Sequence, residues 1–241
     1  MQVVSVCSLK GGSGKTTLVG HLAVAAERRT GGAVAMIDVD PQGSLAAWSQ
    51  DRQGVPPELV QAAAANLGGE LQRLRERGCR VALIDTPAGA ALPVQRAIEH
   101  GDLIVVPVRP SPHDLRAAPA TLELAARAGK PAVLVLNGAV PGDALTADSM
   151  AALTQLGTLL PAVVGQHTPL VRAMAAGLTV LETEPDHGAA RDILAVWNTI
   201  EERLVRLANR QAFQQRRPGA RFFGRRTQGD EIASAFLARA W

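Results

Sequence analysis

Aromatic side chains and cysteines are scarce in this sequence of 241 residues. Tyrosine is absent, aromatic residues make up 3% of the chain, and Cys7 and Cys79 are the only cysteines. Two cysteines do not suggest a disulfide-bonded secreted scaffold, and Cys7 lies in an apolar run where a small core residue is expected rather than a nucleophile. With 47% hydrophobic residues the chain can still bury a sizeable core, which Ala, Val and Leu must mostly fill.

Long hydrophobic runs and a secretory signal pattern are lacking as well. No apolar run reaches the ~18 residues that a membrane-spanning helix needs. The first residues do not combine a basic start, an apolar stretch and a small-residue cleavage site. The sequence therefore predicts a soluble protein of the cytoplasm.

Positive charge is concentrated near the end of the chain. The formal net charge is +3, yet eight arginines and no acidic residue lie between Arg203 and Gly229. All but three of the basic residues are arginine. The basic excess is therefore a local feature and not a property of the whole chain.

Short apolar runs alternate with helical patterns along most of the sequence. The runs are rich in Val and Ile, bounded by Gly and Pro, and not alternating, which is typical of strands buried on both faces. This order predicts an α/β fold: a doubly wound, mostly parallel sheet with helices on both faces. The expected strands are 3–7, 34–38, 81–85, 103–106, 132–136 and 162–164, with a weaker one at 59–62. The expected helices are 15–29, 66–77, 92–99, 114–128, 144–156, 169–176 and 189–208.

The pattern changes near residue 210. Residues 1–209 contain no linker and are predicted to form one domain. Residues 210–241 are predicted to form a basic extension, because Arg, Pro and Gly are combined there without a helical or strand period. The final segment, DEIASAFLARAW, fits a short helix that would be marginal without a partner surface.

The stretch KGGSGKTT, residues 10–17, follows an apolar strand and begins a helix, which is the context of a phosphate-binding loop. Its glycines let backbone N–H groups approach phosphates, and the helix N-terminus adds positive potential. Lys15 is expected to bind the β- and γ-phosphates, and the Thr16 hydroxyl is expected to bind Mg²⁺. The residues expected to bind nucleotide are Gly11, Gly12, Ser13, Gly14, Lys15, Thr16 and Thr17.

Two further elements end in aspartate. Asp38 and Asp40 follow one apolar strand in AMIDVDPQGSLAAW, at the end where doubly wound sheets bind ligands, although Asp-Pro-Gln-Gly is also ordinary turn chemistry. Asp85 ends another in VALIDTPAG and is expected to hold Mg²⁺ through water, because Mg²⁺ dehydrates reluctantly. Three elements in this order within about 80 residues specify a nucleotide site strongly.

The phosphate loop departs from the generic motif at two neighbouring positions: Leu9 replaces its first glycine, and Lys10 adds a second lysine. With these departures the loop resembles the deviant Walker A signature of the ParA/MinD family of P-loop NTPases. The segments SLAAW and PSPHD are most similar to those of the short ParA-type partition and positioning ATPases. The resemblance covers about residues 1–205 and implies ATP and Mg²⁺ as cofactors.

The resemblance also implies a homodimer in the ATP-bound state, with Lys10 reaching the phosphates of the partner's ATP. It assigns Asp40 to the orientation or activation of the attacking water and Asp38 to support of Mg²⁺ and the closed geometry. The catalytic candidates are Lys10, Lys15 and Asp40, and the metal candidates are Thr16, Asp38 and Asp85.

Asn137 stands where family members place an adenine-contacting residue, although it could equally cap the next turn. Gly138 and Ala139 follow it, so the guanine-reading N-K-x-D pattern is absent, which favours ATP over GTP. The segment Thr168–Glu182 is similar to the family's late segment near the base and the DNA-facing surface.

The sequence is compatible with three different functions for such an ATP-dependent switch. The first is a partition or positioning ATPase that binds non-specific DNA, hydrolyses ATP slowly, and is stimulated by an adaptor on its cargo, in the cytoplasm at the nucleoid. Any single arginine could instead lie in an ion pair on a solvated face. The DNA-binding candidates are Arg172, Arg191, Arg203, Arg206 and Arg210, with Arg216 and Arg217 beyond them.

The second function is a membrane-attached positioning switch of the MinD kind, for which GARFFGRR and IASAFLARAW are the candidate segments. The third is a metabolic ligase or an iron–sulfur ATPase on the same fold. Residues 86–206 contain no cysteine, which disfavours a cluster-bearing dimer, and no constellation of substrate-binding residues for a ligase is evident.

Overall fold

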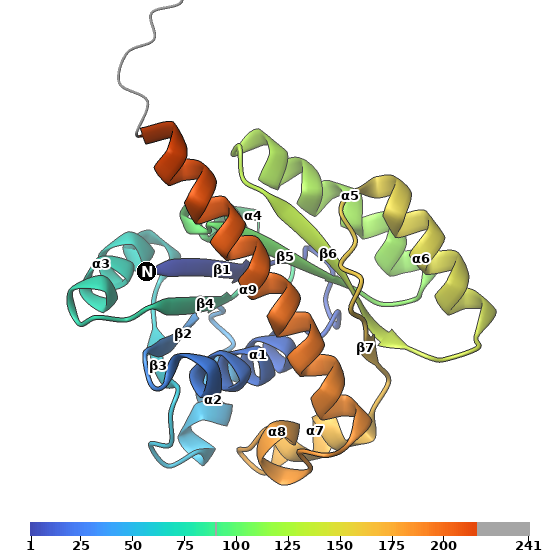
Figure 1. Cartoon of the computed structure of the whole chain (residues 1–241), viewed down its shortest axis with the longest axis horizontal. Helices are drawn as coiled ribbons and strands as arrows, with labels where there is room; N and C mark the ends of the chain where they lie inside the picture. The colour runs from blue at the N-terminus through green and yellow to red at the C-terminus, as the bar shows by residue number, and fades with distance from the viewer. Residues whose placement is uncertain (90, 216–241) are drawn as a thin grey trace, which may run out of the picture. The chain divides into compact units, whose positions relative to one another are not determined.

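A seven-stranded sheet forms the centre of the computed structural model, which describes residues 1–89 and 91–215 (Figure 1). The strand order is β3-β2-β4-β1-β5-β6-β7, and every neighbouring pair is parallel. The predicted doubly wound α/β fold is therefore confirmed. The strands are β1 (Gln2–Val6), β2 (Val34–Asp38), β3 (Glu58–Gln61), β4 (Val81–Asp85), β5 (Leu103–Val108), β6 (Ala132–Ala139) and β7 (Val164–Gly165).

Helices form two groups, one on each face of the sheet. On one face α3 packs on α4, α4 on α5, and α5 on α6; on the other, α1 contacts α2, α7 and α8. The helices of the first group are α3 (Leu67–Glu76), α4 (Ala91–His100), α5 (Pro112–Arg127) and α6 (Ala144–Leu156). The second group consists of α1 (Lys15–Thr30), α2 (Ser44–Asp51), α7 (Thr168–Ala175) and α8 (Val180–Thr183). Helix α9 (Gly188–Gln215) follows α8 in the chain.

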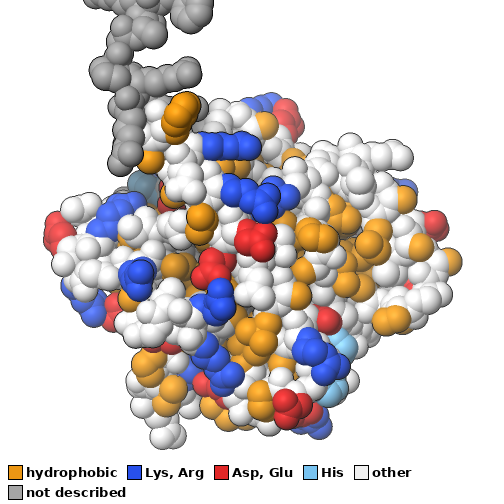
Figure 2. Space-filling model, in the orientation of Figure 1, with side chains coloured by type: hydrophobic (Ala, Val, Ile, Leu, Met, Phe, Trp, Pro, Cys, Tyr) orange, Lys and Arg blue, Asp and Glu red, His pale blue; other side chains and the backbone are white. Residues whose placement is uncertain are grey.

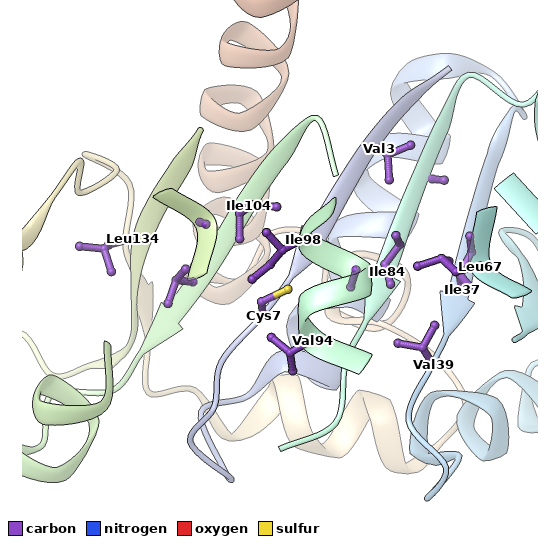
Figure 3. Close-up of a cluster of buried hydrophobic side chains, with 14 of the residues drawn as sticks. Val3, Cys7, Ile37, Val39, Leu67, Ile84, Val94, Ile98, Ile104 and Leu134 are labelled. Carbon is purple, nitrogen blue, oxygen red and sulfur yellow. The ribbon is translucent and has the colours of Figure 1, made fainter. Parts of the chain in front are cut away.

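The central strands are buried on both faces, as their unbroken apolar runs predict. Every residue of β2, β4 and β5 is buried. Figure 3 shows the core between the sheet and the first helix group, where Cys7 lies with Ile84 and Ile98. Burial raises the pKa of the Cys7 thiol to about 12, so this cysteine is a core residue as predicted.

Three helices differ from the sequence expectation. The segments Ser44–Asp51 and Val180–Thr183 were not among the expected helices, but they form α2 and α8. Helix α2 begins after Gly43, which has a left-handed conformation (φ 64°). Helix α9 ends at Gln215 rather than at Ala208. No glycine or proline interrupts the chain between Ala208 and Pro218, so nothing local stops the helix where the pattern fades.

Residues 1–205 form one compact unit, and a second unit begins at Arg206. The predicted boundary at residue 209 stays a prediction. The predicted terminal helix, the GARFFGRR segment and two of the candidate arginines, Arg216 and Arg217, lie outside the described residues. None of the described helices is long and apolar enough to cross a membrane.

Candidate nucleotide-binding site

The three predicted site elements lie together at one edge of the sheet. Strand β4 stands between β2 and β1, and Asp85 pairs in register with Asp38 on one side and Val6 on the other. The phosphate loop follows β1 directly. Because parallel strands end at the same edge, the loop and the two aspartates share the carboxyl edge of the sheet, where doubly wound folds bind ligands.

The phosphate loop closes on the N-terminus of α1 through Gly14, which has φ 90° and caps the helix. A Cβ atom at this position would collide with the Asn137 side chain, so both conformation and space require glycine. The Asn137 amide nitrogen donates a hydrogen bond to the Ser13 carbonyl at 2.8 Å. Asn137 therefore supports the loop from β6, a role the sequence did not reveal, and its contact with adenine stays a prediction.

Leu9 has a structural role at the place where the generic motif has glycine. Its side chain is half-buried and packs against the hydrophobic core. Its N–H donates to Thr121 Oγ1 of α5 at 3.3 Å, and its carbonyl accepts the N–H of Gly89 at 3.0 Å. Leu9 therefore ties the start of the phosphate loop to α5 and to the loop that follows Asp85.

The two lysines of the loop occupy different environments. Lys15 is buried, and its Nζ donates to the Lys10 carbonyl at 3.3 Å. Burial lowers the pKa of Lys15, while the charges of Asp85 and Asp40 act in the opposite direction. The Lys10 ammonium makes an exposed bond to the Gly11 carbonyl at 3.2 Å. One cation therefore lies within the loop and the other on its outer side.

The Thr16 hydroxyl donates to Asp85 Oδ2 at 2.6 Å, which brings the two strongest metal candidates into contact. Asp85 is buried and also accepts the Thr86 N–H through Oδ1 at 3.0 Å. Burial raises the pKa of Asp85 to about 7, partly offset by the Thr16 hydrogen bond. A nearby cation would favour the ionised carboxylate and reverse this shift.

Asp38 is buried and organises the loop that carries Asp40. Its two oxygens accept the N–H of Asp40 at 2.9 Å and the N–H of Ala46, in the first turn of α2, at 3.0 Å. Asp40 is half-buried and turns the chain by accepting the N–H of Gln42 at 2.9 Å. Burial raises the pKa of Asp38. Its part in Mg²⁺ binding stays a prediction.

The residues at this edge fit a magnesium–triphosphate. Mg²⁺ usually takes one or two protein oxygens and completes its shell with phosphate oxygens and water. Thr16 and Asp85 supply an adjacent hydroxyl and carboxylate of this kind. The buried Ser13 hydroxyl has no hydrogen-bond partner within the described residues, a cost that a bound phosphate would relieve.

The candidate DNA-binding arginines are spread over α7 and α9. Arg172 of α7 is exposed and pairs with Glu184 at 2.8 Å. Arg191 of α9 is exposed and donates to the Asp186 carbonyl at 3.0 Å. Arg203 is half-buried, and Arg206 and Arg210 are exposed. On the face in Figure 2, basic side chains are interleaved with acidic ones and do not gather into one patch. Their contact with DNA stays a prediction.

Comparison with known proteins agrees with this geometry. Residues 4–190 match the family described as the CobQ/CobB/MinD/ParA nucleotide binding domain. The protein belongs to this family, and the resemblance inferred from the phosphate loop is confirmed.

The chain is also similar to individual proteins of known name. The chain is 31% identical over 189 residues to the maintenance of carboxysome distribution protein A of Halothiobacillus neapolitanus, covering 74% of this chain and 86% of that protein. It is 30% identical over 128 residues to protein ParA of Rhizobium radiobacter, covering 52% of this chain and 57% of that protein. The solved structure of septum site-determining protein MinD from Pyrococcus horikoshii, complexed with Mg-ADP, has a TM-score of 0.66 at 18% identity and covers 83% and 95% of the two chains. This last likeness establishes a shared fold.

Proposed function

We propose that this protein is an ATP-dependent dimerisation switch of the ParA type. The observation that carries the proposal is the different placement of the two loop lysines. Lys15 is buried within the loop, whereas the Lys10 ammonium makes an exposed bond that a phosphate could replace. A second copy of the chain facing the loop would bring its triphosphate within reach of Lys10. Two lysines would then serve each ATP, one from each protomer.

Each residue of the site has a role in this proposal. Lys15 and the N–H groups of the loop would hold the β- and γ-phosphates, and Thr16 with Asp85 would hold Mg²⁺, which would neutralise phosphate charge. Asp40 positions the attacking water. Lys10 stabilises the charge that develops on the partner's phosphates as the dimer closes. The solved relative with Mg-ADP supports this choice of ligand.

We infer that the ATP-bound dimer binds DNA without sequence preference and thereby segregates or positions a cargo. The similarity to protein ParA and to a carboxysome distribution protein supports this output. Hydrolysis would be slow and stimulated by an adaptor on the cargo, and the protein would lie in the cytoplasm on the nucleoid. The segment needed for a membrane-attached role, within residues 216–241, lies outside the described residues and supplies no observation in favour of that role.

Co-sedimentation with non-specific DNA tests this output. The purified protein is mixed with a long DNA of arbitrary sequence in ATP or in ADP, across a salt series. We expect ATP-dependent binding that weakens steeply with salt, because phosphate contacts release counterions. Equal binding in ATP and ADP would show that the nucleotide does not control DNA binding, and no binding at low salt would show that DNA is not the target.

A further inference from the structure

Helix α2 is fixed to the segment between α7 and α8 by a buried arginine. Arg52, just after α2, is 3% exposed, and its guanidinium lies over the Trp48 ring at 4.9 Å. Its side chain makes hydrogen bonds to Val55, Pro56, Gly177 and both carboxylate oxygens of Glu182. These five bonds use all the N–H donors that a guanidinium has.

The Glu182 carboxylate, which accepts two of these bonds, is itself held in place by hydrogen bonds. Glu182 accepts the N–H and the hydroxyl of Thr179, each at 2.7 Å, and thereby completes a capping box for α8. Burial raises the pKa of Glu182, but the bonds from Arg52 and Thr179 outweigh it and leave the pKa below its usual value. The ion pair is therefore charged and saturated with hydrogen bonds, so it has one geometry.

Backbone packing reinforces this ion pair. Gly177 has φ 70°, and a Cβ atom there would come within 2.8 Å of the Asp51 backbone. The Trp48 indole N–H donates to the Leu178 carbonyl at 3.3 Å. These contacts pack the last turn of α2 directly against the turn before α8. We call Trp48, Arg52, Gly177 and Glu182 the α2 clamp.

Helix α2 connects the clamp to the nucleotide site. The other end of α2 is held by Asp38, which accepts the Ala46 N–H at 3.0 Å and shapes the Asp40 turn. Helix α1, which carries Lys15, packs at the same place, because a Cβ atom at Gly20 would come within 3.2 Å of the Trp48 ring. The Asp40 loop and α2 together therefore lie between two fixed points, Asp38 at the carboxyl edge of the sheet and the clamp at the end of α2.

We propose that Arg52 is a positioning residue for ATP hydrolysis, and that the α2 clamp links the Asp40 loop to the α7–α8 surface that carries Arg172. The inference rests on the proposed function, since it assigns Asp40 to hydrolysis. Arg52 touches neither phosphate nor water. It holds α2 so that Asp40 lies at the attack position, and it passes a displacement of α2 to α7 and α8.

The test compares Arg52→Lys and Gly177→Ala with wild type. Lysine keeps the charge but cannot reproduce the planar fork, and alanine at 177 pushes against Asp51. We expect kcat for ATP to fall about tenfold or more in both variants, because a small displacement of a catalytic group is costly, while the Kd for ATP changes less than about twofold. The control is Arg77→Lys, which alters an exposed ion pair with Glu58 at the amino end of β3 and should leave kcat unchanged.

Hydrogen exchange supplies the second readout. In wild type, replacing ATP by ADP should change the protection of residues 44–52 and 177–183 together; in Arg52→Lys only 44–52 should respond. Melting curves identify any variant that fails to fold, and the other variant then carries the test. The proposal would be overturned if a folded Arg52→Lys or Gly177→Ala protein had the wild-type kcat. It would also be overturned if the hydrogen-exchange protection of residues 177–183 in the wild type were the same in ATP and in ADP. A wild type that does not hydrolyse ATP would instead overturn the proposed function beneath it.

Discussion

The carboxyl edge of the sheet and the arginine-bearing helices differ in how their charged side chains are held. At the edge, Lys15, Asp38 and Asp85 are buried, and each is fixed by hydrogen bonds to the loop or to its neighbours. On α7 and α9, Arg172 and Arg191 are exposed, and each bonds to a nearby acidic residue or carbonyl. The buried charges are therefore held in one geometry, whereas the exposed charges make surface contacts that contribute little to stability.

The largest effect on ATP binding is expected from the buried lysine of the phosphate loop. We expect Lys15→Ala to weaken ATP binding about a hundredfold or more, because it removes a charged hydrogen-bond donor from beneath the phosphates and leaves Asp85 without a nearby cation. Titration calorimetry with ATP measures the loss. Lys130→Ala, on the loop after α5, serves as the control and should bind normally. Retention of tight binding by Lys15→Ala would place the phosphates elsewhere.

Asp40→Ala should separate binding from hydrolysis. The loop would still close around ATP through Lys15 and Thr16, but the attacking water would lose the group that positions it, a contribution of about a hundredfold or more. We expect a variant that binds ATP, turns over very slowly, and accumulates as an ATP-bound dimer in analytical ultracentrifugation. A monomeric variant in saturating ATP would be incompatible with the assigned role.

A buried histidine in α1, His21, should make stability depend on pH. His21 donates from Nδ1 to the Thr17 carbonyl at 2.9 Å and accepts the Val180 N–H at Nε2, so the neutral ring is required. Burial lowers its pKa from 6.5 to about 4. Because the folded pKa is below the unfolded one, its contribution is complete above pH 6.5 and is lost as pH falls towards 4, a difference of about 3 kcal/mol.

Urea unfolding at several pH values measures this effect. In His21→Gln, whose amide can also donate and accept but does not titrate, the free energy of unfolding should fall less between pH 6.5 and pH 4. His113→Gln, on the exposed start of α5, is the matched control. Identical pH profiles for wild type and His21→Gln would show that the buried ring does not govern acid stability.

The smallest effect, on DNA binding, is expected from an exposed arginine of α7. Arg172→Ala should reduce the salt dependence of DNA binding by about 0.9 in the logarithmic slope, the value for one lost phosphate contact, and lower affinity only a few-fold. Arg127→Ala is the control, because Arg127 pairs with Glu123 on the opposite face of the sheet. If Arg127→Ala changes the slope as much as Arg172→Ala does, α7 is not part of the DNA surface.

The difference between the two regions also explains how much the sequence could predict. The strands and the phosphate loop were predictable because apolar runs and glycine spacing are local signals, and Asp38 and Asp85 were predictable from their place at strand ends. Helix α2 was not, because it is short and begins after a turn sequence that suggests a loop. The α2 clamp was not, because Arg52 and Glu182 are separated by 130 residues in sequence.

The role of Leu9 within the phosphate-loop motif was also not predictable from the sequence. The sequence marked it as a departure from the phosphate-loop pattern, but its anchoring bonds reach Thr121 and Gly89 on other loops and helices. Contacts between distant segments leave no periodic signal, so only the folded chain shows them. The sequence does not distinguish the proposed DNA-binding arginines from other exposed arginines, because an exposed charge leaves no packing pattern in the sequence.

The central claim is that Lys10 acts on the ATP of a second copy of the chain. The most direct measurement is the ATPase rate per chain as a function of protein concentration, for wild type and for Lys10→Ala at saturating ATP. We predict that the wild-type rate per chain rises with concentration and levels off as dimers form, while Lys10→Ala binds ATP but stays at a low, constant rate. A wild-type rate per chain that is independent of concentration, or a Lys10→Ala rate equal to that of wild type, would contradict the account.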